Sequence, residues 1–221
     1  MKKIILSIFI LFSGLVIFAQ TSLPLSVITA SDTTKPLIFY ISGDGGFNKF
    51  STSFMQLLNK QGFAIIGLDA RNYFWHKKEP AEAARAIEEV INKYNKQWKR
   101  KNIVLIGYSF GADVSPFMLT HFSADIAGKV SRIVLLSPSD KTDFEIHVLQ
   151  MLGWGSSSGK SVPDEINKIF RPVTIILGDD ENDFSYNKLT IKNKEVVKMP
   201  GGHHYDGDVV ALCKLVAARI K

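Results

Sequence analysis

Short runs of apolar residues recur along the chain, and segments with the spacing of amphipathic helices separate most of them. The runs are continuous and rich in β-branched residues, which is typical of strands covered on both faces of a sheet. They predict strands at residues 37–41, 63–68, 103–106, 133–136, 173–177 and 195–199, with an additional edge strand at 26–30.

The segments with helical spacing predict helices at residues 47–58, about 80–98, from 109 or 110 onward, and from about 208 to the end of the sequence. Pro116 should bend or shorten the third of these helices. Alternation of strand and helix predicts a mainly parallel sheet with helices on both faces. No repeat or second-domain boundary is visible, so residues 20–221 are expected to form one domain.

One interval interrupts this alternation. Residues 140–170 contain no convincing strand, and their centre, residues 153–159, is rich in glycine and serine. Connections of this length are often lids or binding loops. We therefore expect an insertion here that covers or borders a ligand site.

The first residues are expected to be a secretory signal peptide. Two lysines precede an apolar run at residues 4–18, and the small residue Ala19 follows. The run is shorter than the ~20 residues that a spanning helix needs, which favours cleavage after Ala19 over a membrane anchor. Cleavage at this point predicts export and a periplasmic location for the mature chain.

The composition fits an ordinary globular protein, with 46% hydrophobic and 22% charged residues. The formal net charge of +6 comes mostly from scattered lysines, which favour a solvated surface over contact with an anionic membrane. No nucleic-acid-binding motif is present. Cys213 is the single cysteine, so no intrachain disulfide can form, and its helical stripe indicates a buried thiol.

A candidate nucleophile follows the predicted strand at 103–106. Ser109 is the centre of Gly107-Tyr108-Ser109-Phe110-Gly111, and a helical segment continues from it. A sharp strand-to-helix turn needs glycines because side chains would collide there, and it exposes the serine hydroxyl above the sheet edge. With this context, the pattern predicts the nucleophile turn of an α/β-hydrolase fold.

A serine hydroxyl needs a base, and the chain order in this fold is nucleophile, acid, histidine. Gly201-Gly202-His203-His204-Tyr205 follows the last predicted strand, where the base belongs. We favour His204, because it lies two residues beyond the glycine pair and precedes an aromatic residue, with His203 as the alternative. A metal site formed by these histidines with Asp206 and Asp208 is disfavoured, because no separate ligand positions elsewhere complete it.

The orienting acid should follow the strand at 173–177. The turn there contains four carboxylates at residues 179–183. Glu181 is favoured because it lies three residues after Gly178, and Asp183 and Asp180 remain alternatives. The position of the acid along the chain is thus better defined than its identity.

A glycine-rich turn at residues 42–47 follows the first strong strand and is the candidate oxyanion hole. Its glycines allow backbone N–H groups to approach a tetrahedral intermediate, with Phe110 as one donor and Asp44 or Gly45 as the other. Tyr73 and Trp75 follow another strand at the same sheet edge, where ligands bind in open α/β folds, and are candidate substrate contacts.

These motifs together resemble the VirJ/AcvB family of bacterial periplasmic proteins. The resemblance covers roughly residues 35 to 221 and is carried by Ser42-Gly43-Asp44-Gly45-Gly46, Tyr73-Phe74-Trp75, Gly107-Tyr108-Ser109-Phe110-Gly111-Ala112-Asp113, Asp143-Phe144-Glu145-Ile146-His147 and the segment 201–208. The alanine and aspartate that extend the nucleophile turn are more specific than Gly-x-Ser-x-Gly alone.

The resemblance implies a periplasmic α/β-hydrolase with Ser109 and the histidine pair at matching positions. The family is associated with hydrolysis of aminoacylated phosphatidylglycerol, such as the lysyl form, and some members are linked to type IV secretion and virulence. Partners implied in this way are a lipid ester and secretion-system proteins. Under this resemblance the acids Asp44, Asp140, Asp143 and Glu145 are candidates to attract a cationic aminoacyl group.

The residues therefore predict a serine hydrolase of acyl esters that needs no metal or organic cofactor. One alternative is a general carboxylesterase or thioesterase without a lipid role. Another is a secretion-associated binding protein or chaperone that keeps the hydrolase scaffold without its catalysis.

Overall fold

A computed structural model describes residues 23–147 and 159–220. The expected signal peptide at 1–19 and the glycine- and serine-rich centre of the 140–170 interval lie outside these residues, apart from Gly159. In the described part, no helix is long and apolar enough to cross a membrane.

A sheet of seven strands forms the middle layer, in the order β1-β3-β2-β4-β5-β8-β9. The strands are β1 (Leu25–Ile28), β2 (Leu37–Ile41), β3 (Ala64–Leu68), β4 (Ile103–Tyr108), β5 (Val130–Leu136), β8 (Val173–Gly178) and β9 (Lys194–Met199). β1 is antiparallel to β3 and every other pair in this sheet is parallel. The expected strands are therefore all present, with ends shifted by up to three residues.

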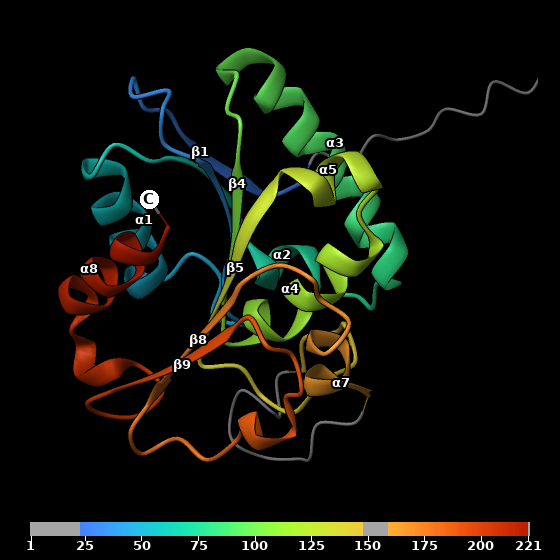
Figure 1. Ribbon diagram of the computed structural model, residues 1–221, viewed down its shortest axis with the longest axis vertical. Helices are drawn as coiled ribbons and strands as arrows, with labels where there is room; N and C mark the ends of the chain where they lie inside the picture. Colours follow the sequence, from blue (N-terminus) through green and yellow to red (C-terminus); the bar gives the residue numbers. More distant parts are fainter. Residues whose placement is uncertain (1–22, 148–158, 221) are drawn as a thin grey trace, which may run out of the picture.

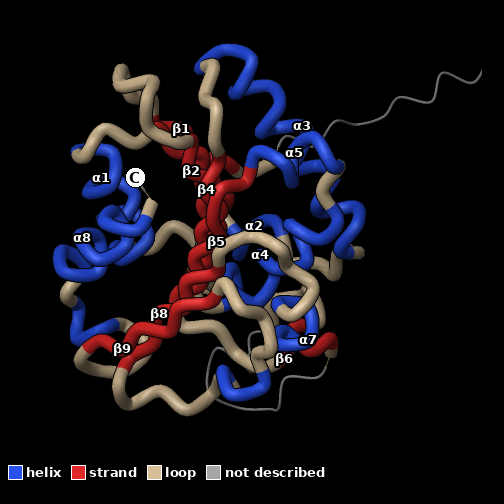
Figure 2. Tube along the Cα trace, viewed as in Figure 1, coloured by secondary structure: helices blue, strands red, loops and turns tan. Residues whose placement is uncertain are grey.

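Helices cover both faces of the sheet, as Figures 1 and 2 show with the sheet seen nearly edge-on. On one face lie α1 (Lys49–Lys60) and α8 (Val209–Arg219). The other face carries α2 (Ala70–Tyr73), α3 (Pro80–Trp98), α4 (Phe110–His121), α5 (Ala124–Lys129) and α7 (Val162–Ile166). Short 3₁₀ turns at Tyr186–Lys188 and Tyr205–Gly207 complete the connections.

The strands bury alternate residues in two separate apolar layers. In β2, for example, Leu37, Phe39 and Ile41 pack toward the face of α3 and α4, whereas Ile38 and Tyr40 pack toward α1 and α8. Both sets are fully buried. This explains why the strands appear in the sequence as continuous apolar runs rather than as alternating ones.

Two sequence expectations need correction. α4 continues through Pro116 to His121, so of the two expected effects of the proline, bending or shortening, the helix is not shortened there. The 140–170 interval, expected to lack strands, contributes β6 (Lys141–Thr142) and β7 (Lys160–Ser161), which pair antiparallel as a small second sheet. With two residues each, these strands are too short to produce a recognisable hydrophobic pattern.

The parallel strands bring four turns to one edge of the sheet, because their carboxyl ends all lie there. These turns follow β2, β4, β8 and β9, and they carry the glycine-rich segment, Ser109, the acidic cluster and the histidine pair. Ligands bind at this edge in open α/β sheets.

The nucleophile turn depends on contact between backbones. A Cβ added at Gly107 would lie 2.2 Å from the carbonyl oxygen of Gly111, and one added at Gly111 would lie 2.2 Å from that of Ile41. Any side chain at either position would push α4 away from β2 and β4. Both glycines are therefore required by close approach, as the sequence pattern predicts.

Gly111→Ala is expected to lower the free energy of unfolding by about 3 kcal/mol, because the added methyl group overpacks the junction of α4 and β2. Gly128→Ala, in α5, is the matched control, since a Cβ there meets nothing within 4 Å and alanine favours the helix by about 0.5–1 kcal/mol. Urea denaturation of the two variants measures the difference. Equal effects would contradict the close approach.

Candidate active site

Ser109 lies at the tip of the turn between β4 and α4. Its backbone has φ 53° and ψ −123°, a conformation that costs a non-glycine residue free energy. The turn is held by the Ser109 N–H, which donates to the carbonyl of Leu136 on β5 at 2.8 Å. The surrounding strands thus fix the half-buried serine in a strained conformation above the sheet edge.

His203, rather than His204, contacts the serine. Its Nε2 lies 2.8 Å from Ser109 Oγ, and its Nδ1 lies 2.7 Å from Oε1 of Glu181. Asp180 and Asp183 are exposed at the same turn; of the three candidate acids, Glu181 is the one that the structure brings to the imidazole. The result is a continuous hydrogen-bonded series of hydroxyl, imidazole and carboxylate.

Our preference for His204 is therefore corrected. Its Nδ1 lies 2.5 Å from the hydroxyl of Tyr108, and that hydroxyl is also 3.2 Å from the backbone carbonyl oxygen of His203. The loop takes left-handed backbone conformations at Gly201, Tyr205 and Asp206. These torsions, rather than the order of residues, decide which imidazole faces Ser109.

Three groups hold the Glu181 carboxylate. Oε2 accepts from the Gly178 N–H at 2.5 Å and lies 2.8 Å from Ser137 Oγ, while Oε1 faces His203. Burial acts to raise the pKa of Glu181, but the hydrogen bonds from His203, Gly178 and Ser137 outweigh it, and the net shift is downward. An ionised carboxylate can only accept, so Ser137 must donate its proton to Oε2.

Ser137 in turn is supported by Tyr205. Its Oγ lies 2.7 Å from the Tyr205 hydroxyl, which is itself 3.0 Å from the carbonyl of Ile176. Ser137 is 2% exposed and has φ 49°, so the network is buried and its backbone is constrained. Sequence analysis missed both residues, because a serine after a strand and a tyrosine after two histidines carry no distinctive spacing.

Three carboxylates influence the protonation of His203. Burial acts to lower the pKa of His203, but the hydrogen bond and charge of Glu181, together with the nearby Asp113 and Asp44, raise it overall. Asp113 accepts from the N–H of Ser139 at 2.6 Å and from its hydroxyl at 2.7 Å. Burial raises the pKa of Asp113 to about 7, against the opposing effect of Ser139.

The glycine-rich turn lies against Ser109. Its Gly46 N–H donates to the Gly43 carbonyl at 3.0 Å, which places Asp44 and Gly45 at the centre of a tight turn. A Cβ at Gly43 would lie 3.2 Å from that of Ser109. Phe110 begins α4, and the first N–H groups of a helix have no acceptor within it.

Two cavities adjoin these segments. One, of about 690 Å³, is lined by Gly45, Gly46 and residues of the turn after β3, including Arg71 and Trp75. The other, of about 740 Å³, lies between α1 and α8 and includes His204 in its wall. Trp75 is 43% exposed, so its position fits a substrate contact, whereas Tyr73 is half-buried and packs edge-on against Phe74 at 4.8 Å.

The proposed cation-attracting acids differ in what they contact. Asp140 accepts from the Ser185 N–H and hydroxyl and from Lys188, and Asp143 lies 2.6 Å from Nε2 of His147. Both are thus engaged in structural hydrogen bonds. Glu145 is half-buried, and the charge of Asp44 contributes to the raised pKa of His203.

In the described ranges, no group of three or more histidine, cysteine, aspartate and glutamate side chains is arranged to hold a metal ion. The ring nitrogens of His203 contact Ser109 and Glu181, and Nδ1 of His204 contacts the hydroxyl of Tyr108.

The strand order, the glycine-bounded turn and the series Ser109–His203–Glu181 are those of a protein with the α/β-hydrolase fold. Residues 35–221 match the model of a family described as bacterial virulence protein (VirJ), and the chain belongs to this family. The resemblance to VirJ seen in the sequence is thereby confirmed. No match was found among curated proteins.

Solved structures with the same fold include several esterases. Est1E from Butyrivibrio proteoclasticus, with ferulic acid bound, has a TM-score of 0.61 and 18% identity over 88% of this chain and 92% of that one. MenH from S. aureus has a TM-score of 0.67 and 12% identity over 88% and 96%. A lipase-esterase related protein from Clostridium acetobutylicum has a TM-score of 0.62 and 16% identity over 89% of this chain and 98% of that one. At such identities the likeness establishes the fold alone.

Ser137→Ala is expected to lower the free energy of unfolding by about 1–3 kcal/mol at neutral pH, because a buried hydrogen bond to a charged carboxylate is lost. The folded-state pKa of Glu181 is lowered, so stability linked to its ionised form is present above about pH 4.3 and lost as the pH falls through the folded value. The difference in the free energy of unfolding between Ser137→Ala and the wild type should therefore become smaller at acidic pH.

The control for this measurement is Ser131→Ala, whose hydroxyl donates to the neutral carbonyl of Ile103. Its effect on unfolding should not depend on the ionisation of Glu181. Urea unfolding of both variants from pH 7 to pH 3.5 tests this difference, and a Ser137→Ala effect that stays constant with pH would show that the serine does not stabilise the carboxylate.

Proposed function

We propose that this protein is a serine hydrolase of carboxylic esters. The observation that carries the proposal is the series Ser109 Oγ to His203 Nε2 at 2.8 Å and His203 Nδ1 to Glu181 Oε1 at 2.7 Å. Nucleophile, base and orienting acid in hydrogen-bond reach of one another are the requirement for activating a serine hydroxyl. The esterases that share the fold give the same chemistry a precedent.

Glu181 sets the tautomer of the base. Because the carboxylate accepts, the Nδ1–H of His203 donates to it, and the lone pair of Nε2 then faces the Ser109 hydroxyl. During attack on an ester carbonyl, Nε2 takes the hydroxyl proton while Oγ forms a bond to the carbonyl carbon. The imidazolium that results is stabilised by Glu181, in agreement with the raised pKa of His203.

The negative oxygen of the tetrahedral intermediate needs hydrogen-bond donors. The N–H of Phe110 and that of Asp44 or Gly45 are proposed for this role, since the first begins α4 and the turn containing the others touches Ser109. A donor aimed at this position is typically worth about 3 kcal/mol in the transition state.

Collapse of the intermediate breaks the bond between the carbonyl carbon and the alcohol oxygen, and His203 returns the proton to that alcohol. Water then attacks the acyl-serine, His203 accepts a proton from it, and the proton passes to Ser109 Oγ as the acid leaves. The sequence of steps is balanced with one ester and one water, and calls for no metal or organic cofactor.

The substrate that we propose is an aminoacyl ester of phosphatidylglycerol. Membership of the VirJ family supports it, and so do the carboxylates of Glu181 and Asp44, whose charges act on His203. Carboxylates beside the site favour a substrate that carries an ammonium group. Asp44 replaces Asp140 and Asp143 as the preferred contact, because those two acids are already paired.

The proposed location is the periplasm, after removal of residues 1–19. The charged start, the apolar run and Ala19 support export, and aminoacyl lipids would be met at the membrane surface. A general esterase or thioesterase role is the second candidate, because a thioesterase domain from the curacin biosynthetic pathway shares the fold, with a TM-score of 0.57.

Ser109→Ala and His203→Ala should each reduce kcat/KM for a soluble ester by about 10⁴-fold or more, because each removes one member of the unit. His204→Ala should lower kcat/KM less than about tenfold, since its ring contacts Tyr108 instead of Ser109. Glu181→Gln should lower kcat/KM far more than its control Asp183→Asn. Labelling by a fluorophosphonate probe reports the nucleophile directly. An inactive His204→Ala beside an active His203→Ala would overturn the assignment.

Purified protein incubated with lysyl-phosphatidylglycerol is expected to release lysine, whereas Ser109→Ala should release none. Asp44→Asn should raise the KM for the cationic lipid by about tenfold and alter turnover of a neutral ester much less. Mass spectrometry of the products measures both. Efficient hydrolysis of short esters with the lipid untouched would favour the general esterase, and absence of any hydrolysis would favour a binding protein.

A further inference from the structure

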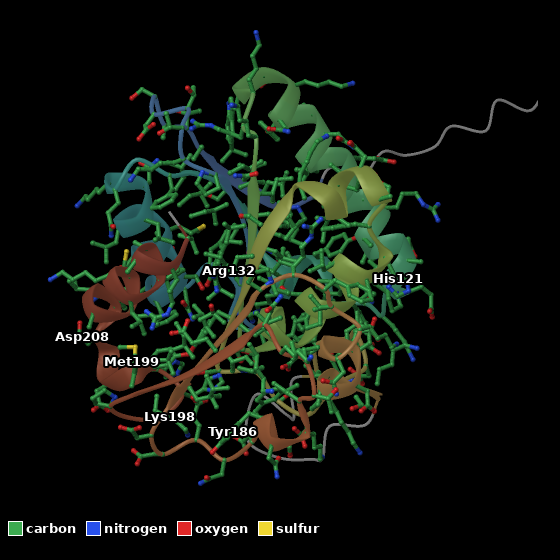
Figure 3. The ribbon with its side chains drawn as sticks, in the orientation of Figure 1. His121, Arg132, Tyr186, Lys198, Met199 and Asp208 are labelled. Atoms are coloured by element: carbon green, nitrogen blue, oxygen red, sulfur yellow. The ribbon has the colours of Figure 1, made fainter. Side chains whose placement is uncertain are left out.

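A groove runs between α1 and α8 on one face of the sheet. Figure 3 places Asp208, at the start of α8, on this side of the molecule, and His121, at the end of α4, on the opposite side. The groove has a volume of about 740 Å³. Its size is in the range of pockets that hold small ligands.

The groove combines an apolar surface with positive charge. Phe50, Leu57, Val209 and Val210 supply the apolar part, and Lys49 and Lys60 stand at the first and last residues of α1. Val210 is 50% exposed although it is an aliphatic residue. Asp208 is the one carboxylate among the described lining residues, and it accepts the Ala211 N–H in the first turn of α8.

This groove adjoins the part of the site that must receive the leaving alcohol. His203 Nε2 hands its proton to that alcohol, so the alcohol oxygen has to lie beside the 203–204 loop. His204 lines the groove, and Phe50 packs on Tyr108 with ring centroids 4.4 Å apart. The alcohol portion of a substrate can therefore extend from His203 over His204 into the groove.

We propose that the α1–α8 groove receives an acyl chain of the lipid alcohol, with Lys49 and Lys60 facing the anionic headgroups of the membrane that holds it. The inference rests on the proposed ester hydrolysis at Ser109. Apolar burial supports insertion of a chain, and each lysine near an anionic surface strengthens attachment severalfold. The groove thus defines the leaving-group side of the site, and the turn at Gly45 the acyl side.

A rival candidate for membrane contact lies at the other edge of the sheet. Phe170 is 95% exposed, and Lys168 and Arg171 flank it in the sequence just before β8. β8 has six residues, so this edge is about 20 Å from the turn that carries Glu181. A lipid held at Phe170 would lie far from Ser109, which is why the groove is the better position for a substrate.

The groove is tested with Ser109→Ala protein, which binds lipid without consuming it. Co-sedimentation is measured with unilamellar vesicles of phosphatidylcholine alone and of phosphatidylcholine with phosphatidylglycerol. Val210→Glu and Lys49→Glu, each added to this background, should weaken binding to the anionic vesicles by about tenfold. Phe170→Glu is the matched control and should bind as its parent does.

The two groove variants are expected to remain folded. Val210 is half exposed, and glutamate at position 49 lies in the first turn of α1, where a negative charge favours the helix. In protein with Ser109 intact, both should lower turnover of vesicle-bound aminoacyl lipid about tenfold and leave p-nitrophenyl acetate hydrolysis within twofold. The selective loss identifies a lipid contact.

Three results would overturn the groove as the lipid site: parental binding by both groove variants, weakened binding by Phe170→Glu alone, or equal and weak binding of the parent to both vesicles. Failure of the proposed function is a separate result, namely no turnover of any ester by the wild type. Because the vesicle measurement uses an inactive protein, it decides the role of the groove in either case.

Discussion

The close approach of α4 to the ends of β2 and β4 is the constraint on which the site depends. Gly107 and Gly111 allow backbone atoms to meet where any other residue would place a Cβ atom, and Ser109 is held between them in a strained conformation. A comparable approach exists at the turn after β8, where a Cβ at Gly178 would lie 2.3 Å from the Gly201 carbonyl oxygen. Serine, acid and histidine are thus brought together by backbones in contact, and the side chains need little freedom to meet.

The hydrogen bonds behind the three residues then fix their charges. Glu181 receives donors on both oxygens, so it stays ionised although its side chain is 7% exposed. The ionised acid raises the pKa of His203, and the buried Asp113 ties the nucleophile helix to Ser139 beyond β5. The positive φ angles of Ser109 and Ser137 are strained, and the hydrogen bonds around these two residues hold them in that conformation.

Much of this arrangement could be predicted from the sequence, because long apolar runs and glycine-bounded turns have direct structural meaning. The strands, the main helices and the turn at Ser109 belong to this class. The two-residue strands β6 and β7 and the six-residue helix α5 do not, since each is too short for a hydrophobic pattern to repeat along it. The choice between His203 and His204 depended on left-handed torsions at Gly201 and Tyr205, and the support from Ser137 depended on contacts between residues far apart in the chain.

Two adjacent residues on the turn after β4 contact two adjacent residues on the turn after β9. Ser109 contacts His203, while Tyr108 contacts His204 and the carbonyl oxygen of His203. The contacts of Tyr108 hold the main chain of the histidine loop independently of the contact between Ser109 and His203. In the proposed mechanism, His203 can accordingly rotate about its own side-chain bonds, between Ser109 and a departing alcohol, while the backbone of the loop stays fixed. The two adjacent histidines thus divide the work: His203 would carry the proton, and His204 holds the loop in place.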